Sequence, residues 1–277
     1  MWKYVAVVSY VGTDFCGWQR QKTPASGGAP SVQATLEQAL SKITGEHPSI
    51  VGSGRTDSGV HALAQVAHFV LKEKEWSPRV LMQGLNSLLS RPGPVRIQIR
   101  SLKGVPIDFH AQRSATKKQY SYYFQQGPCA LPHLEPVSWW IRKSLNIPAM
   151  QEAVSILIGE HDFKPFQASG ARPGPTVRRI LEAEVSFESL SFPGRSLTPD
   201  WSGEVGFVRV RVLGTGFLKQ MVRGIAGTLL QVGDGRREAS CMQTILDSGR
   251  RDLVGPTAPA RALWLERVWY PPEFEIG

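Results

Sequence analysis

The segment Val51-Gly-Ser-Gly-Arg-Thr-Asp-Ser-Gly-Val-His61 lies between two strand-like runs and holds three of the chain's glycines. Glycine allows backbone conformations with positive φ and lets a ligand approach the main chain closely. Between these glycines the segment presents a guanidinium, Arg55, and a carboxylate, Asp57. This pair on a loop is typical of an active site that faces a phosphate-bearing substrate. A tight turn in which Asp57 caps the backbone fits the same residues.

Strand and helix patterns alternate on both sides of this segment. Strands are predicted over 3–10, 95–100, 120–125, 181–187, 208–212 and 263–269. Capped helices are predicted to begin at Ser31, Ser77, Asn146 and about Phe217. This succession predicts an α+β protein with mainly antiparallel sheets flanked by helices. The repetition indicates two related halves, residues 1–111 and 112–277, around a central basic cleft.

Composition narrows the class of protein. The chain has 277 residues, of which 42% are hydrophobic, and its 32 basic and 23 acidic residues give a formal net charge of +9. A basic surface of this size favours a nucleic-acid partner, although cationic surfaces also serve solubility. No apolar run approaches the roughly 20 residues of a membrane helix. With no leader pattern and three widely spaced cysteines, we expect a cytoplasmic protein without disulfides or membrane contact.

The sequence lacks the motifs of a phosphate-binding loop, a serine nucleophile and a metal site. The phosphate-loop order GxxxxGK[ST] is absent, and Ser58 has no GxSxG context. His61 and His68 lie seven residues apart in a predicted strand, so they face opposite sides and make a poor metal pair. We therefore expect neither a metal nor a cofactor.

Two further segments hold candidate residues. In 109–123, basic side chains alternate with tyrosines, Tyr120 among them, and this mixture suits RNA backbone contacts and base stacking. At least one of these tyrosines is expected in the core. In 214–227, Arg223 lies off the apolar stripe of a predicted helix. Arg223 is either a surface arginine or the partner of a carboxylate, for which Asp57 is the obvious candidate.

Taken together, these segments resemble the TruA family of tRNA pseudouridine synthases. The matching pieces run in order along nearly the whole chain: Tyr10-x-Gly-Thr-x-Phe-x-Gly-Trp-Gln-x-Gln21, Ser31-Val-Gln33, Gly54-Arg-Thr-Asp-Ser-Gly-Val-His-Ala62, Asp108-Phe-His-Ala111, Arg113-Ser-Ala-Thr116 with Tyr120, His161-Asp-Phe163 with Phe166, Met221-Val-Arg223 and Thr257-Ala-Pro-Ala260.

The resemblance implies a homodimer that converts uridine to pseudouridine in the anticodon stem-loop of tRNA, at positions 38, 39 and 40. It implies that Asp57 is the catalytic nucleophile or base, after the target base is flipped out of the stack. Tyr120 would stack on that base, and Arg223 would form a salt bridge with Asp57. Arg55 would engage the RNA during flipping. The reaction is an isomerisation and requires no cofactor.

The chain departs from the family pattern at two places. Val11 stands where many members carry aspartate, and a Ser/Pro/Gly-rich stretch over 187–203 lengthens a loop that compact members keep short. Two alternatives compete with the isomerase. A non-catalytic RNA-binding protein or tRNA chaperone would not need the carboxylate of Asp57. A hydrolase that uses Asp57 with His61 lacks a third partner.

Overall fold

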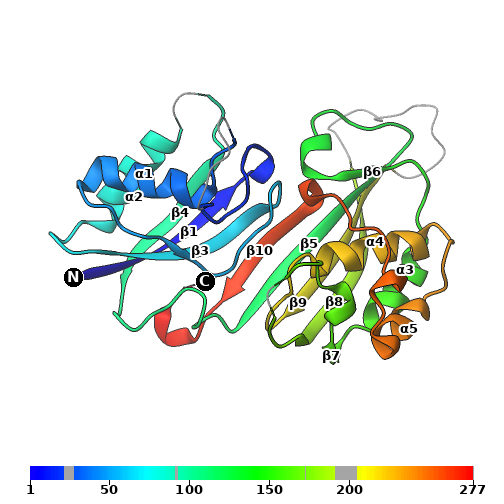
Figure 1. Ribbon diagram of the computed structural model, residues 1–277. Coiled ribbons are helices and arrows are strands. Elements are labelled where there is room, and N and C mark those ends of the chain that lie inside the picture. Colours follow the sequence, from blue (N-terminus) through cyan, green and yellow to red (C-terminus); the bar gives the residue numbers. More distant parts are fainter. Residues whose placement is uncertain (22–27, 91–92, 172, 191–204, 277) are drawn as a thin grey trace. The chain divides into compact units, whose positions relative to one another are not determined.

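The computed structural model describes residues 1–21, 28–90, 93–171, 173–190 and 205–276, and the chain forms two compact units (Figure 1). The first unit comprises Met1–Lys118 and Trp264–Gly277, and the second comprises Gln119–Leu263. These bounds differ from the halves 1–111 and 112–277, because the last strand of the chain returns to the first unit. There it pairs in parallel with a strand that begins at His61, with Trp264 opposite His61.

The first unit contains a sheet in the order β4-β1-β3-β10. Its strands are β1 (Trp2–Tyr10), β3 (His61–Leu71), β4 (Ile97–Val105) and β10 (Leu263–Trp269), and the short β2 (Val51–Gly52) also pairs with β3. Both partners of β1 run antiparallel to it. The loop that carries Asp57 therefore connects two strands, β2 and β3, of this sheet.

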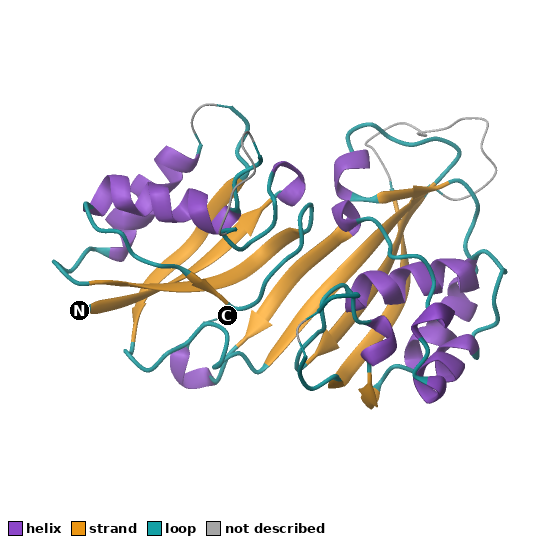
Figure 2. Ribbon diagram, in the orientation of Figure 1, coloured by secondary structure: helices purple, strands orange, loops and turns teal. Residues whose placement is uncertain are grey.

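Two helices, α1 (Val32–Thr44) and α2 (Pro78–Leu89), pack on this sheet (Figure 2). The predicted cap of α1 is confirmed, because Ser31 Oγ accepts a hydrogen bond from Ala34 N at 3.1 Å. Ser77 is the N-cap residue of α2 and Pro78 opens that helix, but the Ser77 side chain makes no capping hydrogen bond. Their apolar stripes are buried in the core, and Leu36, Leu40, Leu81 and Leu85 are at most 2% exposed. The stripes thus fix the helices against the sheet.

The second unit contains a sheet in the order β5-β9-β8-β7. Its strands are β5 (Lys117–Gln126), β7 (Gly159–Asp162), β8 (Val177–Ser189) and β9 (Gly206–Gly214), and β6 (Trp139–Ile141) pairs in parallel with β5. The first two residues of β5, Lys117 and Lys118, belong to the first unit. The helices of this unit are α3 (Ile147–Ser155), α4 (Met221–Gly233) and α5 (Cys241–Ser248). Helix α3 packs on both β8 and α4. The predicted α+β class with mainly antiparallel strands is confirmed.

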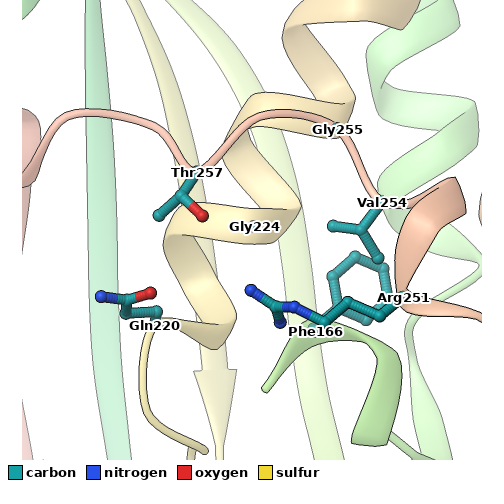
Figure 3. A pocket seen from close by; sticks show the side chains of 7 residues that line it. All are labelled: Phe166, Gln220, Gly224, Arg251, Val254, Gly255 and Thr257. Atoms are coloured by element: carbon teal, nitrogen blue, oxygen red, sulfur yellow. The ribbon is translucent and has the colours of Figure 1, made fainter. Parts of the chain in front are cut away.

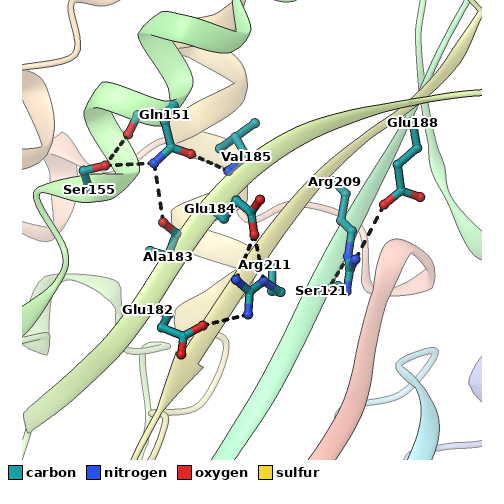
Figure 4. Close-up of polar contacts among 10 residues, drawn as sticks. All are labelled: Ser121, Gln151, Ser155, Glu182, Ala183, Glu184, Val185, Glu188, Arg209 and Arg211. Carbon is teal, nitrogen blue, oxygen red and sulfur yellow. Dashed lines mark hydrogen bonds and ion pairs between the residues drawn. The ribbon is translucent and has the colours of Figure 1, made fainter.

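Polar side chains of β8 and β9 pair across the strands (Figure 4). Arg211 contacts Glu182 at 2.9 Å and Glu184 at 2.8 Å. On the edge of β8 beyond the short β7, Gln151 of α3 accepts a hydrogen bond from Val185 N at 2.7 Å. The side-chain amide of Gln151 thus satisfies the main-chain N–H of Val185, which an unprotected strand edge would leave free to pair with another chain.

Three local expectations differ from the structure. The alternation over 181–187 predicts Leu181 on the same face as the buried Ala183 and Val185, but Leu181 is 37% exposed, because a bulge between Ile180 and Glu182 interrupts the alternation of β8. The apolar spacing of the helix that begins at Asn146 predicts that Ile158 faces inward, but Ile158 is 45% exposed, because α3 ends at Ser155 and the helical period does not extend to it. Helix α4 begins at Met221 rather than near residue 217, because the preceding residue adopts a left-handed conformation.

The predicted loop insertion over 187–203 begins inside β8, which continues to Ser189, and its residues 191–203 lie outside the described part of the chain. None of the helices in the described ranges has the length and apolar character needed to cross a membrane.

Candidate active site

The loop that carries Asp57 is packed against the segment Tyr10–Trp18. The hydrogen bonds that join them include Trp18 N to Thr56 O at 3.1 Å, Ser58 Oγ to Phe15 O at 3.0 Å and Gly12 N to His61 Nδ1 at 3.0 Å. Two motifs that are separate in the sequence therefore form one structural element.

Gly17 shows how closely the two segments approach. Its φ is +102°, and a Cβ built on it would lie 2.7 Å from Thr56 O. Side chains with a Cβ rarely adopt this conformation, and no real Cβ comes so near an oxygen. The glycine is thus required by the contact that holds the Asp57 loop.

A buried polar network lies beneath the loop. Tyr10 Oη is 2.8 Å from Thr56 Oγ1, and burial raises the pKa of Tyr10 to about 12. Ser53 Oγ donates to Gln65 Oε1 at 2.6 Å, and Gln65 Nε2 donates to Gly54 O at 2.9 Å. Satisfied networks of this kind hold a segment in one conformation. The main chain before Asp57 is therefore fixed from below.

Arg55 and Asp57 lie on the outer side of this element. Arg55 is exposed and Asp57 is half-buried. The turn is closed by the main-chain carbonyl of Asp57, which accepts a hydrogen bond from Val60 N at 3.1 Å. The loop thus combines a fixed backbone with a guanidinium and a carboxylate near solvent, which is the arrangement that acid–base or nucleophilic chemistry needs.

The tyrosines of β5 lie in different environments in the second unit. Tyr120 is 9% exposed, and its ring meets that of Phe217 edge to face with centroids 5.0 Å apart. Tyr122 is fully buried, donates to Pro259 O at 2.9 Å and has its pKa raised by burial. Tyr122 is therefore the core tyrosine that the sequence led us to expect.

Arg223 is anchored in the first turn of α4. It is half-buried, its Nε donates to Ala258 O at 2.7 Å, and its main-chain oxygen accepts from Ala258 N at 3.1 Å. Tyr122 donates a hydrogen bond to the next carbonyl, that of Pro259. The side chains of Arg223 and Tyr122 are therefore both hydrogen-bonded to the main chain of the 257–260 motif. Such anchoring distinguishes Arg223 from an ordinary surface arginine.

A polar cavity of about 140 Å³ lies beside the same turn of α4 (Figure 3). It is lined by Phe166, Gln220, Gly224, Arg251, Val254, Gly255 and Thr257. Gln220 has a φ of 61°, a strained value for a side chain with a Cβ. Gln220 and Arg251 are not predictable from the sequence, because neither the strain nor the cavity leaves a local sequence signal.

The two histidines beside the Asp57 loop have structural partners. His61 accepts from Gly12 N and stacks on Trp264 with centroids 4.3 Å apart. His68 is 7% exposed and accepts from Ala111 N at 3.1 Å. Both rings are therefore packed side chains with hydrogen-bond partners in the protein. In the described part of the chain, no cluster of three or more His, Cys, Asp or Glu could hold a metal ion.

The structure thus groups the sequence-predicted residues in pairs. Arg55 and Asp57 share the loop of the first unit, whereas Tyr120 and Arg223 belong to the second unit.

Comparison with known proteins identifies the family. A family model described as tRNA pseudouridine synthase matches residues 6–112 and 153–271. A tRNA pseudouridine synthase A from Syntrophotalea carbinolica is 38% identical over 267 residues, which cover 96% of each chain. The tRNA pseudouridine synthase A from Bdellovibrio bacteriovorus is 38% identical, and the match covers 97% of this chain and 95% of that protein. The one from Lactococcus lactis is 36% identical, and the match covers both chains completely.

Among solved structures, a chain in the crystal structure of a Cbf5-Nop10-Gar1 complex is 16% identical, and the match covers 82% of this chain and 45% of that chain. Its TM-score of 0.29 is too low to bear on the fold. The match of the family model and the full-length relatives agree with the motifs quoted above. This chain belongs to the tRNA pseudouridine synthase family, a family of isomerases.

Proposed function

We propose that this protein isomerises uridine to pseudouridine in the anticodon stem-loop of tRNA, at positions 38, 39 and 40, with Asp57 as the catalytic group. The observation that carries the proposal is the Asp57 loop, which is hydrogen-bonded to Tyr10–Trp18 from one side and to a buried network from below. Full-length similarity to proteins named tRNA pseudouridine synthase A supports it. A non-catalytic RNA-binding protein would need no carboxylate at this position.

The reaction balances within the substrate. The bond between C1′ of the ribose and N1 of uracil breaks, the uracil rotates, and a bond forms between C1′ and C5. The hydrogen of C5 leaves as a proton, and N1, released from the ribose, takes up a proton. Asp57 supplies either the nucleophile or the base, and nothing is oxidised or reduced. No cofactor is therefore part of the proposal.

The roles of the other residues follow from the motifs that resemble those of the TruA family, and the charge and shape of the side chains fit these roles. The exposed Arg55 binds RNA while the target base leaves the stack, a step that costs a few kcal/mol. Tyr120 stacks on the flipped base. Arg223 acts as the cation that keeps Asp57 ionised, since a positive neighbour lowers the pKa of a carboxylate. Its anchor on Ala258 O would hold the guanidinium in one direction.

The direct test uses tRNA transcribed with uridine tritiated at C5. Bond formation at C5 expels the label, so the purified protein should release tritium without any added cofactor. No release from several tRNAs to which binding is confirmed would favour the RNA-binding protein. Changing Arg223 to Lys keeps the charge but loses the Nε hydrogen bond, so we expect slower release with tRNA affinity largely retained.

The positions modified are tested separately. Uridines 38, 39 and 40 are replaced by cytidine singly and then together. Release should fall with each replacement and vanish with the triple one. Release that persists from the triple variant would place the target elsewhere in the tRNA. We also propose that the protein acts as a homodimer in the cytoplasm; light scattering at assay concentration should give twice the 30.6 kDa chain mass.

A further inference from the structure

Lys118, the second residue of β5, reaches back to the Asp57 loop. It is half-buried, and its Nζ donates to the main-chain carbonyl of Ser53 at 2.6 Å. Ser53 is fully buried, and its own amide donates to Val66 O at 2.7 Å. The lysine therefore bonds to a part of the loop that solvent does not reach.

Two consecutive carbonyls of the loop are held by side chains. Lys118 bonds Ser53 O, and Gln65 Nε2 bonds Gly54 O at 2.9 Å. Together they orient the peptide planes on both sides of Gly54. Because only two residues separate Gly54 from Asp57, these planes determine where the chain presents the carboxylate.

Gly54 leaves room for the ammonium. A Cβ built on Gly54 would lie 3.1 Å from Lys118 Nζ, closer than nine in ten real Cβ contacts. The space beside the glycine is therefore filled by the amine of the lysine.

Holding a cation here is unfavourable for folding. Burial lowers the pKa of Lys118 to about 8, so the amine is mostly protonated near pH 7 at a cost in desolvation. The ammonium donates to a neutral carbonyl of Ser53. A residue kept at such a site is better explained by function than by stability.

We propose that Lys118 is a positioning residue for the reaction: its ammonium fixes the Ser53 carbonyl and thereby the course of the chain from Gly54 to Asp57. This inference rests on the proposed function of Asp57. The contrasting possibility is a lysine that contacts an RNA phosphate, and the two roles predict different measurements.

The test compares Lys118→Met and Lys118→Arg with Lys103→Met, which removes an equal charge from the same unit at a side chain that is 38% exposed. The measurements are the single-turnover rate of tritium release, the Kd for tRNA and its salt dependence, and the melting temperature. Lys118→Met should slow release about tenfold or more, with Kd within about twofold of wild type. The melting temperature of Lys118→Met should not fall, because the desolvation cost of the buried ammonium is relieved and offsets the loss of its hydrogen bond.

Lys118→Arg should recover part of the rate, and Lys103→Met should match wild type. A weaker Kd with a salt slope reduced by about one would make Lys118 a phosphate contact and overturn the inference. An unchanged rate would overturn it as well. A rate lost in proportion to a lower melting temperature would show a merely structural role.

A second readout does not depend on activity. Amide hydrogen exchange of residues 54–60 should be faster in Lys118→Met than in wild type, with α1 unchanged. Unchanged exchange in the loop overturns the inference, even if the wild-type protein releases no tritium. Lack of release by wild type would instead count against the proposed function, so the two failures are distinguishable.

A double-mutant cycle tests the contact with Gly54. Gly54→Ala should accelerate exchange in the loop, since its new methyl requires the ammonium to move back by a few tenths of an ångström. In a Lys118→Ala background the same change should add little, because the space is empty. Additive effects would show that the two residues act independently and would overturn the inferred contact.

Discussion

Gly227 of α4 offers a quantitative test of how Arg223 is held. A Cβ built on Gly227 would lie 1.7 Å from Pro256 O. Real Cβ atoms essentially never come within 3.0 Å of such an atom, so Gly227→Ala must separate the helix from this segment by at least 3.0 − 1.7 = 1.3 Å. Three hydrogen bonds cross this contact: Ala258 N to Arg223 O, Arg223 Nε to Ala258 O and Gly255 N to Thr228 Oγ1.

At about 1 kcal/mol each, loss of these bonds costs about 3 kcal/mol, and the better helix propensity of alanine returns about 1 kcal/mol. We expect Gly227→Ala to lower the free energy of unfolding by about 2 kcal/mol and to slow tritium release beyond what the folded fraction explains.

Gly224→Ala is the matched control one turn away in the same helix. Its Cβ would meet Phe166 and Val254 at 3.4 Å, a distance at which small adjustments of the side chains suffice. Urea denaturation of both variants gives the comparison. If Gly227→Ala is as stable and as active as Gly224→Ala, the reasoning that this contact anchors Arg223 is refuted.

Three further outcomes are expected. Burial, and then the charges of His110 and other neighbours, lower the pKa of His68 from 6.5 to about 4. Between pH 6.5 and about 4 the unfolded chain therefore binds a proton that the folded chain does not. The free energy of unfolding should fall as the pH is lowered through this range, by at most about 1.4 kcal/mol per pH unit. His68→Asn should flatten that slope in urea titrations between these pH values; an unchanged slope assigns it to other groups. Tyr122→Phe removes the bond to Pro259 O and should cost about 1 kcal/mol of stability; no loss in urea denaturation would contradict this. Binding of tRNA should weaken steeply with salt, and Arg55→Ala should reduce the log–log slope by about one; an unchanged slope would place Arg55 away from phosphates.

Local signals allowed much of the fold to be predicted. Ser31 caps α1 and Pro78 opens α2, because these positions depend on side chains within a few residues of the helix start. The last strand was predicted with its observed bounds, 263–269. Ile158 and Leu181 were predicted wrongly, since a helix end and a bulge interrupt the periods on which the prediction relied.

The candidate site was predictable in its residues but not in its supports. The glycine-rich motif pointed to Asp57, yet the bonds from Tyr10–Trp18 join residues about 40 positions apart and leave no periodic signal. The hydrogen bond from Arg223 Nε to Ala258 O likewise joins residues far apart in the sequence and leaves no periodic signal. The catalytic role of Asp57 and the basic cleft stay predictions.

The most direct test of the central claim compares wild type with Asp57→Asn in single-turnover tritium release, at enzyme concentrations that bind all the tRNA. The amide has nearly the shape of the carboxylate but is neither a nucleophile nor a base of comparable strength. The account predicts release by wild type and none above background by the variant, with Kd for tRNA and melting temperature essentially unchanged. Release by Asp57→Asn at the wild-type rate would contradict it.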